Sequence, residues 1–89
     1  MRLVKEHANK IVNIEHSSVV VIPAGEFSLG DALIIFNNRD EFGTIQSDVP
    51  NSYRSCSPHK TSTIEFPPRC MMNAVFIDSE TVVFMRGQA

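Results

Sequence analysis

Long apolar runs and dense clusters of one charge are both missing from this sequence of 89 residues. No run approaches the roughly 18 consecutive apolar residues that a membrane helix needs, so no membrane partner is expected. The N-terminal stretch MRLVKEHANK carries too many charges for the apolar segment of a signal peptide. The eight Lys and Arg residues are scattered and the formal net charge is -2. A nucleic-acid partner is therefore not expected either, because it would need clustered cations.

Residues that commonly build metal centres and active sites are also scarce. The two cysteines, Cys56 and Cys70, are expected to be free thiols rather than a disulfide, because no secretion signal precedes them. The histidines show no close spacing with each other or with a cysteine; they are His7, His16 and His59. The sequence contains no nucleophile elbow, phosphate-binding loop or zinc-protease helix. It therefore predicts no enzyme, no cofactor and no metal.

The sequence does contain a series of short apolar runs separated by turn residues. A content of 43% hydrophobic and 20% charged residues is typical of a soluble globular protein, and this length allows one domain. Residues with β-branched or aromatic side chains dominate the runs, which favours strands over helices. We expect strands at residues 10–15, 18–22, 31–38, 43–46, 62–66, 71–77 and 81–85.

Six or seven short strands with few helical stretches predict an all-β fold. We expect a small antiparallel β-sandwich or a jelly-roll-like barrel. Residues 1–16 are predicted to form an N-terminal arm that includes a candidate first strand, and residues 17–89 the sandwich domain. Residues 1–9 fit either a helical turn or two, or an extended arm.

A polar stretch at residues 46–62 interrupts the pattern of strands. Structureless loops of this length are uncommon in compact domains and are usually functional or mobile. Tyr53 and Arg54 within it belong to the residue types that are enriched at protein interfaces. Tyr53 is either a partner contact or a ring that folds back over the edge of the core.

Several expected strands are apolar on both faces, whereas a sandwich strand normally has one wet face. The clearest case is ALIIF at residues 32–36, and VVVI at 19–22 and VVFM at 82–85 are similar. Either the chain's own loops and arm cover the outer faces, or another subunit does. Because a core of this size leaves a small margin of stability, a subunit interface would supply additional stabilisation.

The stretch VVVIPAGEFSLGDALIIFNN, residues 19–38, resembles the start of a small all-β domain of tailed-bacteriophage structural proteins. A weaker similarity continues through residues 43–46, 63–77 and 80–87. The residues that carry the resemblance form the turns and strand ends of the pattern: Pro23, Ala24, Gly25, Phe27, Gly30, Asp31, Asn37 and Asn38. Without the resemblance, these residues are expected to be architectural, with Phe27 closing one end of the core.

The resemblance implies a virion component, made in the host bacterial cytoplasm. We expect a capsid decoration (cement) protein, a homotrimer on the capsid surface that binds the major capsid protein or another virion protein and stabilises the assembled head. The alternative is a tail-fibre, baseplate or head-fibre tip module that binds a virion partner or a host glycan. A cupin-like sugar-binding or enzyme domain is more distant. The candidate partner contacts are the N-terminal arm, the 46–62 stretch with Tyr53 and Arg54, and Arg69.

Overall fold

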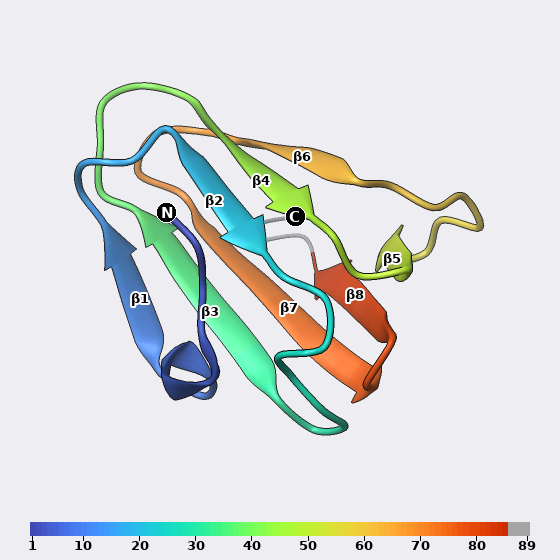
Figure 1. The fold of residues 1–89 in the computed structure, drawn as a ribbon. Coiled ribbons are helices and arrows are strands. Elements are labelled where there is room, and N and C mark those ends of the chain that lie inside the picture. Colours follow the sequence, from blue (N-terminus) through green and yellow to red (C-terminus); the bar gives the residue numbers. More distant parts are fainter. Residues whose placement is uncertain (86–89) are drawn as a thin grey trace.

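The computed structural model describes residues 1–85, which form a two-layered all-β sandwich (Figure 1). A five-stranded sheet has the order β1-β3-β7-β8-β5 and a three-stranded sheet has the order β2-β4-β6. The expected sandwich is thus confirmed, and the last two residues of the weakly similar stretch 80–87 lie outside the described residues. The elements are a 3-10 turn, η1 (Lys5–His7), and the strands β1 (Ile11–Ile14), β2 (Val19–Ile22), β3 (Ala32–Asn37), β4 (Gly43–Ser47), β5 (Asn51–Arg54), β6 (Thr63–Phe66), β7 (Met71–Asp78) and β8 (Thr81–Met85).

From β1 to β7 each strand lies in the sheet opposite to the one before it. The pairs β1–β3, β2–β4 and β5–β8 are parallel. The pairs β3–β7, β4–β6 and β7–β8 are antiparallel. The sheets are therefore mixed rather than purely antiparallel. The short polar link at residues 78–80 predicts the β7–β8 hairpin, which the structure confirms. The other turn residues show where strands begin and end, but not whether the chain crosses to the other layer.

The core lies between the two sheets and is built by alternation along each strand. In β3, for example, Leu33 and Ile35 are buried while Ile34 and Phe36 face outward and are half-buried. This is the period-two pattern of a strand with one face on a core. The buried apolar side chains are Leu3, Val12, Ile14, Val20, Ile22, Phe27, Leu33, Ile35, Ile45, Val49, Ile64, Phe66, Ala74, Phe76, Val82 and Phe84.

The N-terminal arm is part of the sandwich rather than a projection from it. The Leu3 amide donates to the Val21 carbonyl at 2.9 Å, and the Val21 amide donates to the Met1 carbonyl at 2.7 Å. Leu3 is completely buried, and the chain then makes the short turn η1 before β1. Both expectations for residues 1–9 are therefore met in part, by an extended segment and by one helical turn. The arm covers the free edge of β2, which would otherwise expose unpaired backbone groups.

The polar stretch at residues 46–62 is not structureless, because it contains β5. Ser47 and Ser52 face each other inside it, with their hydroxyl oxygens 2.6 Å apart, and both residues are buried. The Ser52 hydroxyl also donates to the Val49 carbonyl at 3.1 Å. The buried side chains here are hydrogen-bonded serines, so this stretch lacks the apolar residues from which a strand is predicted. The irregular part of the stretch is the segment between β5 and β6, which extends away from the sheets (Figure 1).

Candidate functional site

The segment between β2 and β3 carries most residues of the recognised pattern, and it joins the two layers. Gly25 and Gly30 have φ values of 78° and 89°, a region that glycine enters without steric cost. Pro23 is buried at the end of β2, whereas Ala24 is exposed. The ring of Phe27 is buried against that of Phe76, with centroids 5.2 Å apart. These residues build the crossing between the sheets and present no reactive group.

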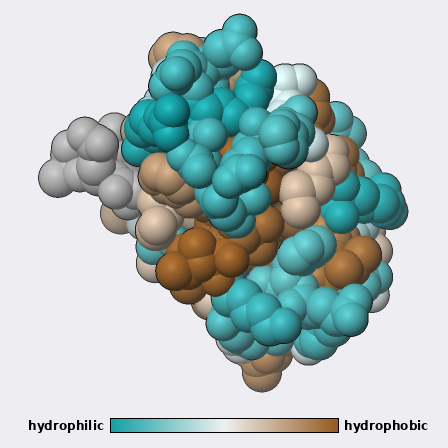
Figure 2. Space-filling model, turned by 90° about the vertical axis from the view of Figure 1, so that its left-hand side faces the viewer, coloured by the Kyte–Doolittle hydropathy of each residue, from teal (hydrophilic) through white to brown (hydrophobic). Residues whose placement is uncertain are grey.

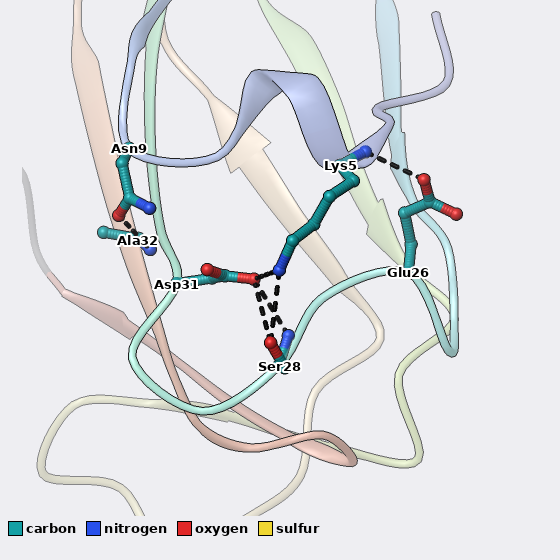
Figure 3. Close-up of polar contacts among 6 residues, drawn as sticks. All are labelled: Lys5, Asn9, Glu26, Ser28, Asp31 and Ala32. Carbon is teal, nitrogen blue, oxygen red and sulfur yellow. Dashed lines mark hydrogen bonds and ion pairs between the residues drawn. The ribbon is translucent and has the colours of Figure 1, made fainter.

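Asp31 anchors this segment to the N-terminal arm (Figure 3). Its carboxylate accepts hydrogen bonds from the Lys5 ammonium and, at 2.9 Å, from the Ser28 backbone N–H. The Lys5 hydrogen bond first, and then that of Ser28, hold the pKa of Asp31 below its ordinary value, against the opposing effect of burial. On the other side of the arm, the Lys5 backbone N–H donates to Glu26 at 2.8 Å. The cluster fastens the arm to the β2–β3 segment.

Asn37 and Asn38, the last residues of the pattern, differ in their surroundings. Asn37 is buried, and its amide nitrogen lies 3.0–3.1 Å from the carbonyl oxygens of Glu41, Phe66 and Pro67. It thereby links β3 in one sheet to the end of β6 in the other. Asn38 is half-buried, and its backbone N–H donates to the Ile14 carbonyl at 2.8 Å. Both residues hold the fold together at this end of the sandwich.

The three residues expected to be partner contacts are not brought together. Tyr53 is half-buried on β5, in register with Val83 of β8. Arg54 follows it and is exposed at the start of the projecting segment. Arg69 is exposed, and its guanidinium donates to Asp40 Oδ1 at 2.9 and 3.1 Å in the turn that follows β3. Tyr53 and Arg54 thus border one edge of the five-stranded sheet, while Arg69 is engaged by the chain itself.

The outer face of the five-stranded sheet is a broad apolar surface. The strand registers place Ile34 beside Ile11 and Asn73, and Val75 beside Val83. On this face Ile11 is 68% exposed and Ile77 54%, and the other apolar side chains are partly exposed. Figure 2 views the sandwich edge-on from the side of β1, and apolar surface at this edge lies between hydrophilic surface above and below. The outward residues are Ile11, Asn13, Ala32, Ile34, Phe36, Asn51, Tyr53, Met71, Asn73, Val75, Ile77, Asp78, Thr81, Val83 and Met85.

The outer face of the three-stranded sheet differs in character. Its central strand β4 directs Thr44 and Gln46 outward, and the registers place Glu65 and Thr63 beside them on β6. Val19 and Val21 on β2 supply its apolar part. One fold therefore carries two outer faces, one mainly polar and one mainly apolar. Because large contiguous apolar patches on small proteins mark interaction sites, the apolar face is the candidate functional surface.

Asn73 lies on β7, the middle strand of the five-stranded sheet. Its side-chain oxygen is buried and has no hydrogen-bond partner within residues 1–85. The register places it between Ile34 of β3 and Met85 of β8. A buried polar atom without a partner costs about 1–3 kcal/mol. The centre of the apolar face therefore holds an amide oxygen that lacks a partner within the described chain.

The remaining chemistry of the described residues is sparse. Within residues 1–85 no group of three His, Cys, Asp or Glu side chains is placed to hold a metal ion. Both cysteines, Cys56 and Cys70, are free thiols in this structure. None of the described helical segments has the length and apolarity to span a membrane.

Strand order is what sequence reasoning missed about the apolar face. The doubled apolar pattern of ALIIF and VVFM did indicate an outer apolar face. It did not show that β3 lies beside β7, because this pair joins strands that are distant along the chain. Comparisons with family models, with curated proteins and with solved structures found no match to this chain.

Proposed function

We propose that this chain is a bacteriophage capsid decoration protein, a structural component that self-associates and binds the assembled head. The observation that carries the proposal is the apolar outer face of the five-stranded sheet. Exposed apolar side chains such as Ile11 and Ile77 on a sheet face favour burial against another subunit over a monomeric state. The resemblance of residues 19–38 to a phage structural domain indicates that this assembly is a phage particle.

The segment between β5 and β6 is the proposed contact with the capsid lattice. It extends from the sandwich (Figure 1) and carries the exposed side chains of His59 and Lys60, while the exposed Arg54 ends β5 just before it. The N-terminal arm, the other contact expected from the sequence, is fastened to β2 and to the β2–β3 segment. The β5–β6 segment is held to β5 at its base, where the Thr61 backbone N–H donates to the Ser52 carbonyl at 2.8 Å, but its exposed residues project from the sandwich and are therefore the proposed contact.

Stabilisation of the head follows from mass action. A protein that contacts several capsid subunits at once binds the closed lattice more tightly than it binds a loose subunit. Any ligand that binds one state preferentially shifts the equilibrium toward that state. Each copy would add modest binding free energy, and many copies on one head would oppose its disassembly together. No bond is made or broken, so no catalytic group is needed.

Co-sedimentation with purified heads tests the proposal. We expect the chain to pellet with expanded heads of the phage that carries its gene, and not with isolated tails. Lys60→Glu should weaken binding, because it reverses a charge on the projecting segment, while Lys10→Glu at the start of β1 is the matched control. Pelleting with tails or host cells alone would contradict the decoration role and favour a fibre-tip role.

A further inference from the structure

We infer that a second copy of this chain covers the outer face of the five-stranded sheet, with the two copies related by a two-fold axis close to Asn73. The inference deepens the proposed function, since it names the partner of the apolar face, and it shares with that function the premise that the face is covered. The inference rests on three properties of the face: its few charges, its size and the asparagine at its centre.

The scarcity of charge among the outward side chains favours a copy of the same chain. The outward positions of the paired strands are apolar or neutral polar except for Asp78, which lies at the end of β7 beside Thr81, away from Asn73. When a face meets itself across a two-fold axis, charges near the axis meet like charges and repel. A face made for a different partner usually offers charges that complement that partner. An apolar face whose one charge lies far from its centre meets the requirement of self-pairing.

The size of the face is sufficient for a weak dimer. Five strands spaced about 4.8 Å apart, each rising about 3.3 Å per residue, give a face of roughly 20 by 20 Å. Two such faces in contact cover roughly 400 Å² each in projection, below the roughly 800 Å² of accessible surface per partner in a standard interface. Corrugation by side chains raises the accessible area above the projected area. We therefore expect dissociation at micromolar rather than nanomolar concentration.

Asn73 gives the pairing a defined register. It lies on the middle strand of the sheet, where a two-fold axis through the centre of the face would pass. Across that axis the two amides can exchange hydrogen bonds, each oxygen accepting from the nitrogen of the other copy. Rotation of the amide exchanges the places of its oxygen and nitrogen, so either atom can face the partner. A polar pair inside an apolar interface is a known device for fixing register and oligomeric state.

A two-fold pair uses one surface twice, which suits a single face centred on β7. A closed trimer instead requires two different surfaces on each subunit that fit one another. The three-stranded sheet, with its largely polar outer face, is a poor complement to the apolar face. The geometry thus points to a dimer, in place of the homotrimer that the resemblance implies.

The mass of the full chain in solution tests the inference first. Light scattering coupled to size exclusion, with a reducing agent so that the exposed Cys56 cannot cross-link copies, gives the mass at each concentration. We expect the chain mass of 9.9 kDa at low concentration and twice that mass at high micromolar concentration. A monomer at every concentration, or a trimer, would overturn the two-fold dimer.

A pair of matched lysine variants tests the face. Val75→Lys and Thr44→Lys each alter a half-buried, β-branched, outward residue on the central strand of its sheet. Val75→Lys should raise the dimer dissociation constant by more than about 100-fold, because it buries unpaired charge in the interface. Thr44→Lys should leave the constant within about twofold, since surface changes remote from an interface are nearly neutral. Equal dissociation constants for the two variants would rule out the apolar face as the interface.

Asn73→Asp is a second variant that tests the face if Val75→Lys does not fold. It preserves the size of the side chain. The same-face neighbours Ile34, Met71, Val75 and Met85 do not titrate, so the introduced carboxylate would be the titrating group at the centre. Two carboxylates across the axis should weaken the dimer about tenfold at neutral pH. Relative to the unaltered chain, the loss should disappear as pH falls below the ordinary aspartate pKa of about 3.9. If Asn73→Asp left the dimer dissociation constant unchanged at neutral pH, Asn73 could not lie at the two-fold axis.

The outcomes separate this inference from the proposed function. A monomer that pellets with heads, and loses that binding in Val75→Lys, would overturn the dimer and keep the decoration role. A dimer that fails to pellet with heads would support the dimer and overturn the decoration role.

Discussion

Replacing Asn37 by alanine should destabilise the protein far more than replacing its neighbour Asn38. The Asn37 amide nitrogen lies within hydrogen-bond distance of three carbonyl oxygens, from Glu41, Phe66 and Pro67, and the residue is 1% exposed. Alanine would leave these acceptors without their donor in a place that water reaches poorly. The link between the end of β3 and the end of β6 would be lost with it.

The expected size of the effect follows from the count of donors. Two amide hydrogens serve three acceptors, so the side chain makes the equivalent of two full hydrogen bonds, and each buried group left unpaired costs about 1–3 kcal/mol. The Asn37 oxygen has no partner within residues 1–85, and removing it offsets part of this loss. We therefore expect a net loss of about 2–3 kcal/mol. For a domain of this size each kcal/mol lowers Tm by about 4–8 °C, so Tm should fall by roughly 10–20 °C.

Thermal unfolding followed by circular dichroism measures the change, with urea unfolding as the second probe. Asn38→Ala is the matched control: Asn38 is half-buried, its amide donates to Glu15 at 3.5 Å, and its oxygen accepts from Arg69. The control should lose less than about 1 kcal/mol, as exposed side-chain interactions contribute little. Equal Tm shifts for the two variants, or a shift below about 4 °C for Asn37→Ala, would refute the assignment of Asn37 as the link between the sheets.

Three further predictions concern stability. Because the pKa of Asp31 is lowered in the folded state, its stabilisation is present above the ordinary carboxyl pKa and is lost as pH falls through the lowered pKa. The difference in urea midpoint between the unaltered chain and Asp31→Asn should therefore shrink from pH 7 to about pH 3, and a constant difference would contradict it. Gly43→Ala should lose about 1–3 kcal/mol in urea unfolding, since its new Cβ would lie 2.8 Å from the Ser18 backbone oxygen. Leu3→Ala should lose about 2–5 kcal/mol if the arm is part of the core, and a loss under about 1 kcal/mol would show a detachable arm.

The fold class and most strands were predictable because they depend on local pattern. In β6, Ile64 and Phe66 are buried while Thr63 and Glu65 are exposed, as alternation predicts. The strand β5 was not predictable from apolar periodicity, because its buried inward residue is Ser52, whose hydroxyl finds partners in Ser47 and Val49. The parallel pairing was not predictable either, since it depends on the crossing of each turn between layers.

The candidate surface was only partly predictable. The double apolar character of β3 indicated a covered outer face, and the structure places Ile34 and Phe36 there. Asn73 carried no signal in the sequence, because an asparagine between apolar residues of a strand gives no hint that it lies at the centre of a sheet. Its position follows from the order of the strands, which joins residues distant along the chain.

That strand order also sets a sequence of events during folding. Within the described chain, β7–β8 is the one strand pair made by consecutive strands, and every other pair must close a longer loop. Folds dominated by such distant pairings fold slowly, in milliseconds to seconds. Because β8 lies between β7 and β5, β5 has no strand of its sheet to pair with until β8 has been placed. The polar character of β5 is therefore favourable during folding. An apolar strand that stayed unpaired until β8 had formed would promote aggregation.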